Sequence, residues 1–546
     1  MDENAHWIER IAEKVAAEKK PPYVVNSGMT PSGPVHLGTL CEFLYPAAIT
    51  EFLSRNSKAS FSFIADDMDA FDRVPASAAE HAKELEPHLG KPLCRVPDPM
   101  GCCKSLGEHF LKDAEGAMEK FEARPKILRA SELYAEGKYD KYALLFFERL
   151  EEVKRAVYES SLRNELPGWW SPVMPVCRKC GRISTTRVIS FDFEDGGVCE
   201  YACDRDLKYV KGCGFVGEAR IKEHEYKITW RLDWPARQDF LDVSVEGGGM
   251  DHFTRGGSRD TAVAIHEKIF GKSPPVGYRF GFVLLKGKKY SKSKGEGMGV
   301  ADLGELIPPE VLKYALLRPD VQENKDIDTS GEAMLRLCEE YLAASRIKLD
   351  GGTGAEGSSA GSHQGERGTD TASAEGGPSG AQPAGSGLSR ADRKKAVAFG
   401  LSTKKQKFSM FSEILLFYQL YRDWKKVAEL SDKKSAEYLK PYIENWVRLQ
   451  FLPEEYAFEY APRELRGNAE LVHAFAERLE PKMTALDVHN LVFEVARGRG
   501  EKPEELFKDI YETLINKPKG PKLGKLIEAL GIAKVKSTLL ELHKKK

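Results

Sequence analysis

A turn near the N-terminus holds the first residues whose types and spacing could do chemistry. Residues 27–39 read SGMTPSGPVHLGT and follow the short apolar run 23–25, which predicts a buried strand. Apolar residues recur at helical spacing from Leu40 to Leu53, so we expect this turn to join a strand to a helix. The unpaired N–H groups and the positive dipole end of such a helix favour a phosphate group, with His36 aimed at it. The alternative is an ordinary turn whose histidine caps the helix or lies on the surface.

A second group of chemically capable residues lies about 250 residues downstream. Residues 278–285 predict another buried strand, and residues 286–295 follow it with five lysines and two glycines. Flexible ammonium groups suit the triphosphate of a nucleotide better than a rigid guanidinium does. The alternative is a solvated basic loop without a ligand.

Acidic residues follow a further predicted strand at residues 59–64. Asp66, Asp67, Asp69 and Asp72 come directly after it. Because ligands of parallel sheets bind beyond the carboxyl ends of the strands, these carboxylates could hold an ammonium group or orient a ribose. The pattern does not decide between Asp66 and Asp67, and Asp72 is expected to begin a turn.

Aromatic residues and glycines mark a third stretch of possible site residues. Trp230 and Trp234 flank Asp233, an arrangement that could wall a long alkyl-ammonium side chain, although core tryptophans are the alternative. Residues 240–245 then predict a strand, and the glycine-rich turn after it ends in Asp251 and His252. We expect these two residues at the ligand-binding edge of the sheet.

Five of the ten cysteines fall between Cys177 and Cys213, a pattern typical of a metal site in a reducing compartment. Cys177 and Cys180 form a C-x-x-C-G knuckle, and Cys203 with Cys213 is the predicted second pair, leaving Cys199 as the spare. Four thiolates select Zn(II), and such a closed shell is structural rather than catalytic. The alternative is a degraded knuckle with free thiols.

Composition predicts a multidomain globular chain without a membrane anchor. The 546 residues are 41% hydrophobic with a mean hydropathy of −0.44, and 82 basic against 83 acidic residues leave a net charge of −1. Any nucleic-acid-binding surface must therefore be local. We see no apolar run long enough to span a membrane and no signal peptide, so we expect a cytoplasmic protein.

The pattern changes along the chain and predicts six regions. We expect the first half of a catalytic domain with a helical cover at 1–165, a zinc-binding insertion at 166–225 and the second half with the lysine loop at 226–300. Helices should fill 301–350. Residues 351–389 are rich in Gly, Ser and Ala without aromatic residues, so we expect a disordered insertion. Residues 390–546 are helical in pattern throughout, with lysines concentrated at 517–525 and 534–546.

The order of these motifs resembles the class I aminoacyl-tRNA synthetases. Residues 36–39 match their His-Ile-Gly-His signature and residues 289–293 match their Lys-Met-Ser-Lys-Ser signature, with Thr39 and Tyr290 as departures. The Cys-x-x-Cys insertion, the Trp-Arg-x-Asp-Trp-Pro run at 230–235, Asp251-His252 and the Gly-Pro-Lys-Leu-Gly run at 520–524 sharpen this resemblance. Together they look like the class I lysyl-tRNA synthetases, typical of archaea and some bacteria, over nearly the whole chain except the 351–389 insertion.

This resemblance implies an α/β fold: a Rossmann-type parallel-sheet catalytic domain with a zinc-ribbon-like insertion, and an all-α anticodon-binding region after it. It implies activation of L-lysine with ATP and Mg(II) to lysyl-adenylate, then transfer to the terminal ribose 2′-hydroxyl of tRNA(Lys) by a monomeric enzyme. The alternatives are a class I synthetase for another amino acid, a small-molecule adenylate-forming ligase, or a non-catalytic tRNA-binding paralogue.

The resemblance also assigns site residues. The catalytic residues would be His36, Lys289 and Lys292. The ATP-binding residues would be Pro31, Ser32, Gly33, His36, Gly38, Thr39, Ser291, Lys292, Ser293 and Lys294. The positions matching the family's amino-acid pocket are Gly28, Thr30, Trp230, Asp251, His252 and Tyr278, to which we add Asp67 from the acidic run.

Overall fold

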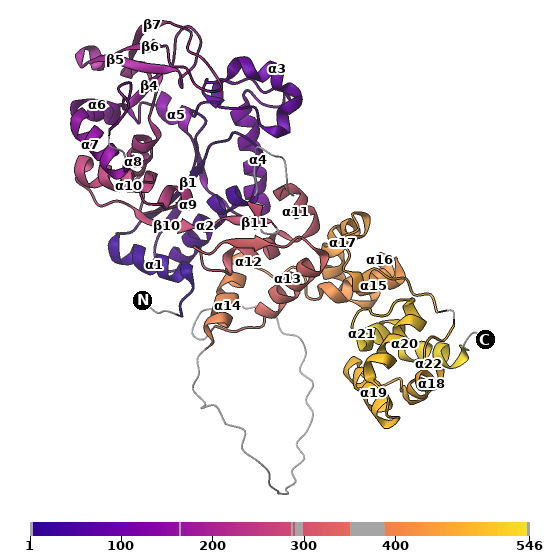
Figure 1. Cartoon of the computed structure of the whole chain (residues 1–546). Coiled ribbons are helices and arrows are strands. Elements are labelled where there is room, and N and C mark those ends of the chain that lie inside the picture. The colour runs from indigo at the N-terminus through magenta and orange to yellow at the C-terminus, as the bar shows by residue number, and fades with distance from the viewer. Residues whose placement is uncertain are drawn as a thin grey trace.

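A computed structural model describes residues 4–162, 165–285, 288–289, 299–349, 388–462 and 464–542. Figure 1 shows a sheet-containing body at the N-terminal side and a helical arm that ends in the C-terminal helices. In the described part of the chain, no helix combines the length and the apolar character needed to cross a membrane.

The body is built around a five-stranded sheet in the order β10-β9-β1-β2-β3, in which all neighbouring strands are parallel. Its strands are β1 (Tyr23–Met29), β2 (Ala59–Ala65), β3 (Lys126–Arg129), β9 (Val245–Gly249) and β10 (Val276–Phe280). Such a sheet is covered on both faces, which explains why Val25 and Phe63 are fully buried. The direction of winding reverses between β1 and β9, and ligands of doubly wound folds bind at that point. The predicted α/β class is confirmed.

Helices connect and cover the strands. They are α1 (Trp7–Glu18), α2 (Leu37–Leu53), α3 (Ala82–Leu85), α4 (Leu106–Lys120), α5 (Ala130–Ala135), α6 (Asp140–Glu148), α7 (Leu150–Ser160), α8 (Trp230–Phe240), α9 (Met250–Phe253) and α10 (Ser258–Ile265). Local sequence fixes several of their starts: His6 and Glu9 form a capping box for α1, and Ser105 caps α4.

The cysteine-rich insertion forms two small antiparallel sheets. One pairs β4 (Val173–Pro175) with β8 (Tyr226–Ile228), and the other is β5-β6-β7 (Thr186–Asp192, Val198–Cys203, Val216–Arg220). The β4–β8 pair joins the insertion to the catalytic body, because α8 begins two residues after β8.

A third part of the body follows the main sheet. It contains β11 (Val283–Leu285), β12 (Lys288–Lys289), α11 (Val300–Leu306), α12 (Pro309–Leu317), β13 (Lys325–Ile327) and α13 (Gly331–Ala344). Helix α14 (Arg390–Ser402), capped by Ser389, packs against α12 and α13. Helix α14, the first helix of the predicted 390–546 region, therefore lies beside α12 and α13 (Figure 1). Of the predicted disordered insertion, residues 351–387 lie outside the described residues.

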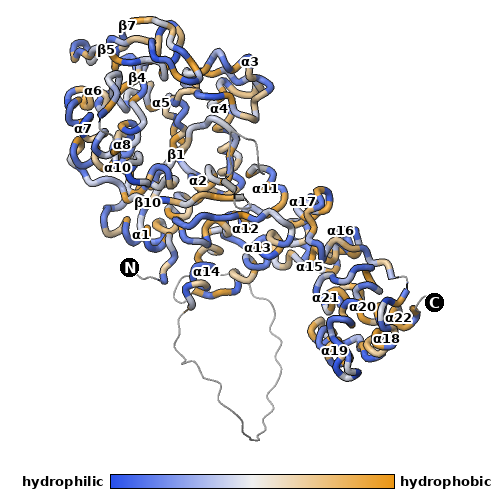
Figure 2. Tube along the Cα trace, in the orientation of Figure 1, coloured by the Kyte–Doolittle hydropathy of each residue, from blue (hydrophilic) through white to orange (hydrophobic). Residues whose placement is uncertain are grey.

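The arm contains α15 (Phe411–Tyr421), α16 (Trp424–Leu430), α17 (Lys433–Arg448), α18 (Ala469–Arg478), α19 (Ala485–Gly498), α20 (Pro503–Ile515), α21 (Leu523–Leu530) and α22 (Ile532–Glu541). Apolar and polar residues alternate along these helices, as Figure 2 shows, and their apolar faces form a shared core. The described residues of this region form no strand, so its predicted all-helical character is confirmed.

Candidate active site

The signature turn places His36 at the start of α2. His36 is the N-cap residue, and the backbone N–H of Thr39 donates to its Nδ1 at 3.2 Å. A neutral imidazole that accepts at Nδ1 carries its proton on Nε2, so this ring can donate a hydrogen bond from Nε2. A Cβ at Gly38 would lie 3.0 Å from Cε1 and 3.1 Å from Nδ1 of His36, tighter than ordinary contacts, so glycine lets the ring pack here. The second signature residue, Thr39, is buried.

A cavity of about 490 Å³ opens beside this turn, where the sheet changes its direction of winding. Eight of the predicted site residues line it: Gly28, Thr30, Ser32, His36, Gly38, Thr39, Trp230 and His252. Its other lining residues are Met29, Glu42, Asp66, Asp69 and Arg237. Pro31 and Gly33 belong to the same turn but are not among the lining residues.

Glu42 is a cavity residue that the sequence analysis missed. It lies on α2, and its Oε2 accepts a hydrogen bond from the hydroxyl of Ser27 at 2.8 Å. Burial raises the pKa of Glu42 to about 8, and the nearby Glu246 adds to this rise. Position 42 is three residues after Thr39 and four after Gly38, so it shares their helix face. This spacing was the sequence signal that could have identified Glu42 as a site residue.

A group of buried charged side chains lies beside the cavity, on the side of Asp66 and Asp69. The ammonium of Lys227 lies 2.5 Å from Asp66, 3.0 Å from Asp69 and 3.7 Å from Asp233. Arg237 adds contacts to Asp66 at 3.4 Å and to Asp233 at 3.8 Å. The three carboxylates raise the pKa of Lys227 above its ordinary value, although burial opposes this. Lys227 belongs to β8 and so ties the insertion to the cavity.

The predicted acidic residue Asp67 is not brought to the cavity. Both of its carboxylate oxygens accept hydrogen bonds from Ser131, one from the backbone N–H at 2.8 Å and one from the hydroxyl at 2.6 Å. Burial raises the pKa of Asp67. Asp66 and Asp69 line the cavity instead, and Asp69 accepts a 2.5 Å hydrogen bond from Thr30.

Aromatic rings form another wall of the cavity. Trp230 stacks on Trp234 with centroids 5.6 Å apart, and the ring of His252 lies 5.8 Å from that of Trp230. The indole N–H of Trp230 donates to Ser258 at 3.1 Å, which fixes the ring. Burial lowers the pKa of His252, which favours the neutral ring. Asp233, expected between the two tryptophans, points instead to Lys227 and Tyr134.

Two further predicted residues lie outside the lining. Tyr278 is buried on β10, where its ring occupies the space that a side chain at residue 247 would need: a Cβ on Gly247 would lie 2.3 Å from Cζ of Tyr278. Burial and the nearby Glu42 raise the pKa of Tyr278. Asp251 lies on α9 and is exposed.

Most of the lysine loop lies outside the described residues. The backbone of Lys288 and Lys289 forms β12, which pairs with β11 in an antiparallel hairpin. Ser291, Lys292, Ser293 and Lys294, and the side chain of Lys289, fall outside the description, so their predicted contacts stay predictions.

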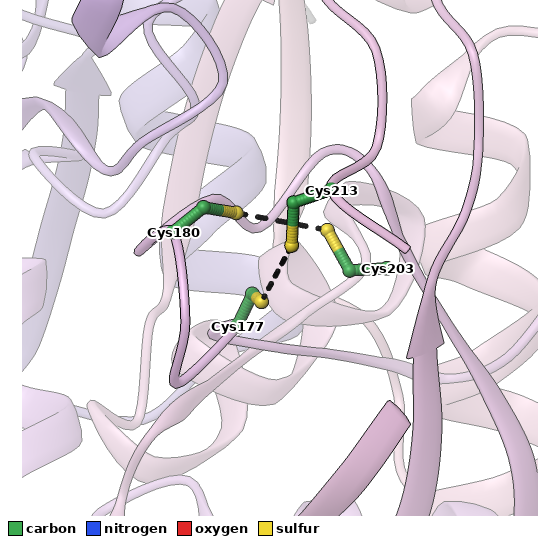
Figure 3. A group of neighbouring side chains, drawn as sticks. All are labelled: Cys177, Cys180, Cys203 and Cys213. Atoms are coloured by element: carbon green, nitrogen blue, oxygen red, sulfur yellow. Dashed lines mark hydrogen bonds between the residues drawn. The ribbon is translucent and has the colours of Figure 1, made fainter. Parts of the chain in front are cut away.

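The four predicted metal-binding cysteines meet in the insertion (Figure 3). The sulfurs of Cys177 and Cys213 are 3.6 Å apart, and those of Cys180 and Cys203 are 3.7 Å apart. These distances are too long for disulfides, but a tetrahedron of sulfurs about 2.3 Å from zinc has edges of about 3.8 Å. The donor set therefore fits Zn(II). Cys199 is buried in a separate apolar cluster.

A second group with metal-binding side chains was not predicted. Asp98, Cys102, Cys103 and His109 have ligand atoms that all lie within 4.8 Å of one another. Cys102 and His109 are 3.1 Å apart, whereas Asp98 accepts three backbone N–H bonds from residues 100, 102 and 103. The C-C-x₅-H spacing before and within α4 was the sequence signal for this group.

The geometry describes a polar cavity at the ligand-binding edge of a parallel sheet, with an imidazole donor, a carboxyl group whose pKa is raised and an aromatic wall. Comparison with known proteins agrees. The family model described as tRNA synthetases class I (K) matches residues 5–366. A lysine–tRNA ligase of Archaeoglobus fulgidus is 30% identical, with 98% of this chain and 99% of that protein aligned. One of Methanosarcina barkeri is 31% identical over 96% and 95% of the two chains.

Among solved structures, a glutamate tRNA ligase from Elizabethkingia meningosepticum aligns with 95% of this chain and 98% of its own, at 14% identity and a TM-score of 0.38. The match of the family model over most of the chain, together with relatives of this identity along nearly all of it, shows the family. This chain belongs to the class I tRNA synthetases of the (K) family.

Proposed function

We propose that this chain activates L-lysine with ATP and transfers it to tRNA(Lys), as the names of its relatives say of those proteins. The observation that carries this proposal is the cavity at the end of β1 and β9, which combines the signature histidine with a buried acidic group and an aromatic wall. A role in translation leads us to expect the enzyme in the cytoplasm.

Glu42 is the residue that we assign to the side-chain ammonium of the substrate. It is the cavity carboxylate that the cations Lys227 and Arg237 do not contact, because these pair with Asp66, Asp69 and Asp233. An ammonium group placed beside Glu42 would favour its ionised form and so recover the cost of burying the carboxylate. The ring of Trp230 would cover the alkyl chain, and Gly28 and Thr30 would face the α-amino group.

Adenylate formation requires little covalent chemistry from the protein. The carboxylate of lysine attacks the α-phosphorus of ATP, a phosphorus–oxygen bond forms, and the bond to pyrophosphate breaks in line. Negative charge grows on the phosphoryl oxygens, where the Nε2–H of His36 and the N–H groups at the start of α2 can donate. Lys289 and Lys292 are proposed to neutralise the leaving pyrophosphate. Mg(II), when bound with ATP, supplies further positive charge to the phosphates.

The second step transfers the lysyl group. The terminal 2′-hydroxyl of the tRNA attacks the carbonyl carbon of the adenylate, and an ester bond forms. The carbon–oxygen bond to AMP breaks, and the hydroxyl proton passes to a phosphate oxygen of the departing AMP. The helical arm is proposed to hold the anticodon, and a zinc ion on Cys177, Cys180, Cys203 and Cys213 to hold the insertion together.

Pyrophosphate exchange tests the proposal. The purified chain should exchange labelled pyrophosphate into ATP only with lysine when each of the twenty amino acids is offered in the presence of total tRNA. Exchange with another amino acid, or with none, would reject it. The first result would favour a synthetase of different specificity, and the second a non-catalytic tRNA-binding protein.

A further inference from the structure

Thr30 and Asp69 meet at the wall of the catalytic cavity because they follow neighbouring strands. Strands β1 and β2 are parallel, and their last residues, Met29 and Ala65, are paired in the register. Thr30 comes directly after β1, and the loop after β2 brings Asp69 to it. The hydroxyl of Thr30 donates to Oδ2 of Asp69 at 2.5 Å, and both residues line the cavity. The proposed chemistry uses Thr30 but not Asp69.

Strand β8 supplies the cation that sets the charge of Asp69. The ammonium of Lys227 lies 3.0 Å from Oδ1 of Asp69, whereas Thr30 contacts Oδ2. An ammonium group can only donate, so Oδ1 must be an acceptor. Burial and the neighbouring Asp66 raise the pKa of Asp69, and Lys227 and Thr30 oppose this rise. The contacts at both oxygens therefore favour the carboxylate form of Asp69.

This carboxylate fixes the direction of the Thr30 hydroxyl. A threonine hydroxyl carries one proton and two acceptor lone pairs. Because the proton is used toward Asp69, only the lone pairs remain for a ligand in the cavity. A ligand group that binds Thr30 must therefore donate. The α-ammonium group of an amino acid is such a donor and cannot accept, whereas an α-hydroxyl group can do either.

We propose that Asp69 and Lys227 are positioning residues that hold Thr30 as an acceptor for the α-ammonium group of the substrate. The proposal rests on the proposed function and adds to it the basis on which the α-ammonium group is selected. Thr30 contacts the substrate, Asp69 acts through Thr30, and Lys227 acts through Asp69. Because β8 carries Lys227 and pairs with β4, the cysteine-rich insertion contributes to amino-acid selection.

The substitution Asp69→Asn tests this proposal, because it reverses the hydrogen bond without changing the shape of the side chain. Lys227 can only donate, so the amide oxygen must face Lys227 and the NH₂ group must face Thr30. The Thr30 hydroxyl then accepts from this NH₂ group, and its own proton points into the cavity.

In this variant a donor faces the α-ammonium group, so we expect the Kd for lysine to rise about tenfold. The Kd for the α-hydroxy analogue of lysine should change little, since its hydroxyl can accept from Thr30. Calorimetry without ATP measures both constants. The ratio of the Kd for the analogue to the Kd for lysine should therefore fall about tenfold relative to the parent protein.

Asp67→Asn is the matched control. Asp67 lies in the same loop and is buried, but it accepts from Ser131 and is not among the lining residues of the cavity. This variant should keep the parent's ratio of the two constants.

A second pair of variants covers the case in which Asp69→Asn does not fold. Thr30→Val removes the acceptor and should lower the ratio, whereas Thr30→Ser keeps the hydroxyl and should preserve it. If folded Asp69→Asn, or folded Thr30→Val, keeps the parent's ratio, the positioning role is wrong. If the parent shows no lysine-dependent pyrophosphate exchange, the proposed function fails instead.

Discussion

The catalytic cavity and the cysteine insertion are held together by different forces, although Lys227 joins them. The cavity depends on buried charges and hydrogen bonds between segments far apart in the chain, such as residues 66–69 and 227–237. The insertion has a small core around Tyr201 and Ala219 and gathers four thiols in one place. Its stability should therefore depend on an ion, and that of the cavity on the balance of its own charges.

The largest effect should come from removing the cation that both regions share. In Lys227→Met, three carboxylates lose a buried partner, and breaking such a pair costs about 3–5 kcal/mol. The free energy of unfolding in urea measures it. Lys222→Met, at an exposed pair with Asp195, is the control and should cost about 0–1 kcal/mol. Equal losses in the two variants would contradict the difference between the regions.

A smaller but purely chemical effect is expected at His36. His36→Ala should lower lysine-dependent pyrophosphate exchange about a hundredfold to a thousandfold, because one preorganised donor to the phosphoryl oxygens is lost. Lysine binding, measured by calorimetry without ATP, should change little. A similar loss of lysine affinity would show that His36 maintains the shape of the cavity and does not act mainly by stabilising the transition state.

The pH dependence of lysine binding tests whether Glu42 pairs with the side-chain ammonium of the substrate. Its pKa of about 8 in the free protein means that the carboxyl group is protonated at lower pH, whereas a bound ammonium favours the carboxylate. Binding then releases a proton, and lysine affinity should rise roughly tenfold from about pH 6 to about pH 7 and level off above about pH 8. Glu42→Gln should bind lysine weakly at every pH. A flat profile for the parent protein would remove Glu42 from the ammonium site.

The smallest effect on catalysis is expected from the insertion. Cys180→Ser should lose one equivalent of zinc and make residues 177–216 more sensitive to protease, with pyrophosphate exchange changed less than tenfold. Cys199→Ser should keep its zinc, because Cys199 lies in another cluster. Retention of zinc by Cys180→Ser would overturn the assignment. Metal analysis of His109→Ala checks, by the same readout, whether the Asp98 group holds a second ion.

Sequence alone predicted the parts of the site that are local. The turn at 27–39 and the C-x-x-C knuckle have spacings that only a few geometries satisfy, so His36 and Cys177 could be placed without coordinates. The choice between Asp66 and Asp67 could not be made from the sequence, because neighbouring residues at a strand end point to different sides. Only the structure shows that Ser131 hydrogen-bonds to Asp67. Lys227 gave no signal at all, since two of its three carboxylate partners, Asp66 and Asp69, lie in a distant segment of the chain.

The position of α14 has a consequence for engineering the chain. Arg393 donates two hydrogen bonds to Glu9 of α1, at 3.1 and 3.0 Å, so the polypeptide returns to the body before it continues into the arm. Residues 349 and 388, the described residues on either side of the 350–387 segment, thus both adjoin helices of the body, α13 and α14. The closure entropy of a flexible loop changes by only about 0.6 kcal/mol for each doubling of its length, so we expect an insertion between these two residues to be tolerated. We therefore expect a reporter or affinity tag inserted there to leave the reach of the helical arm unchanged.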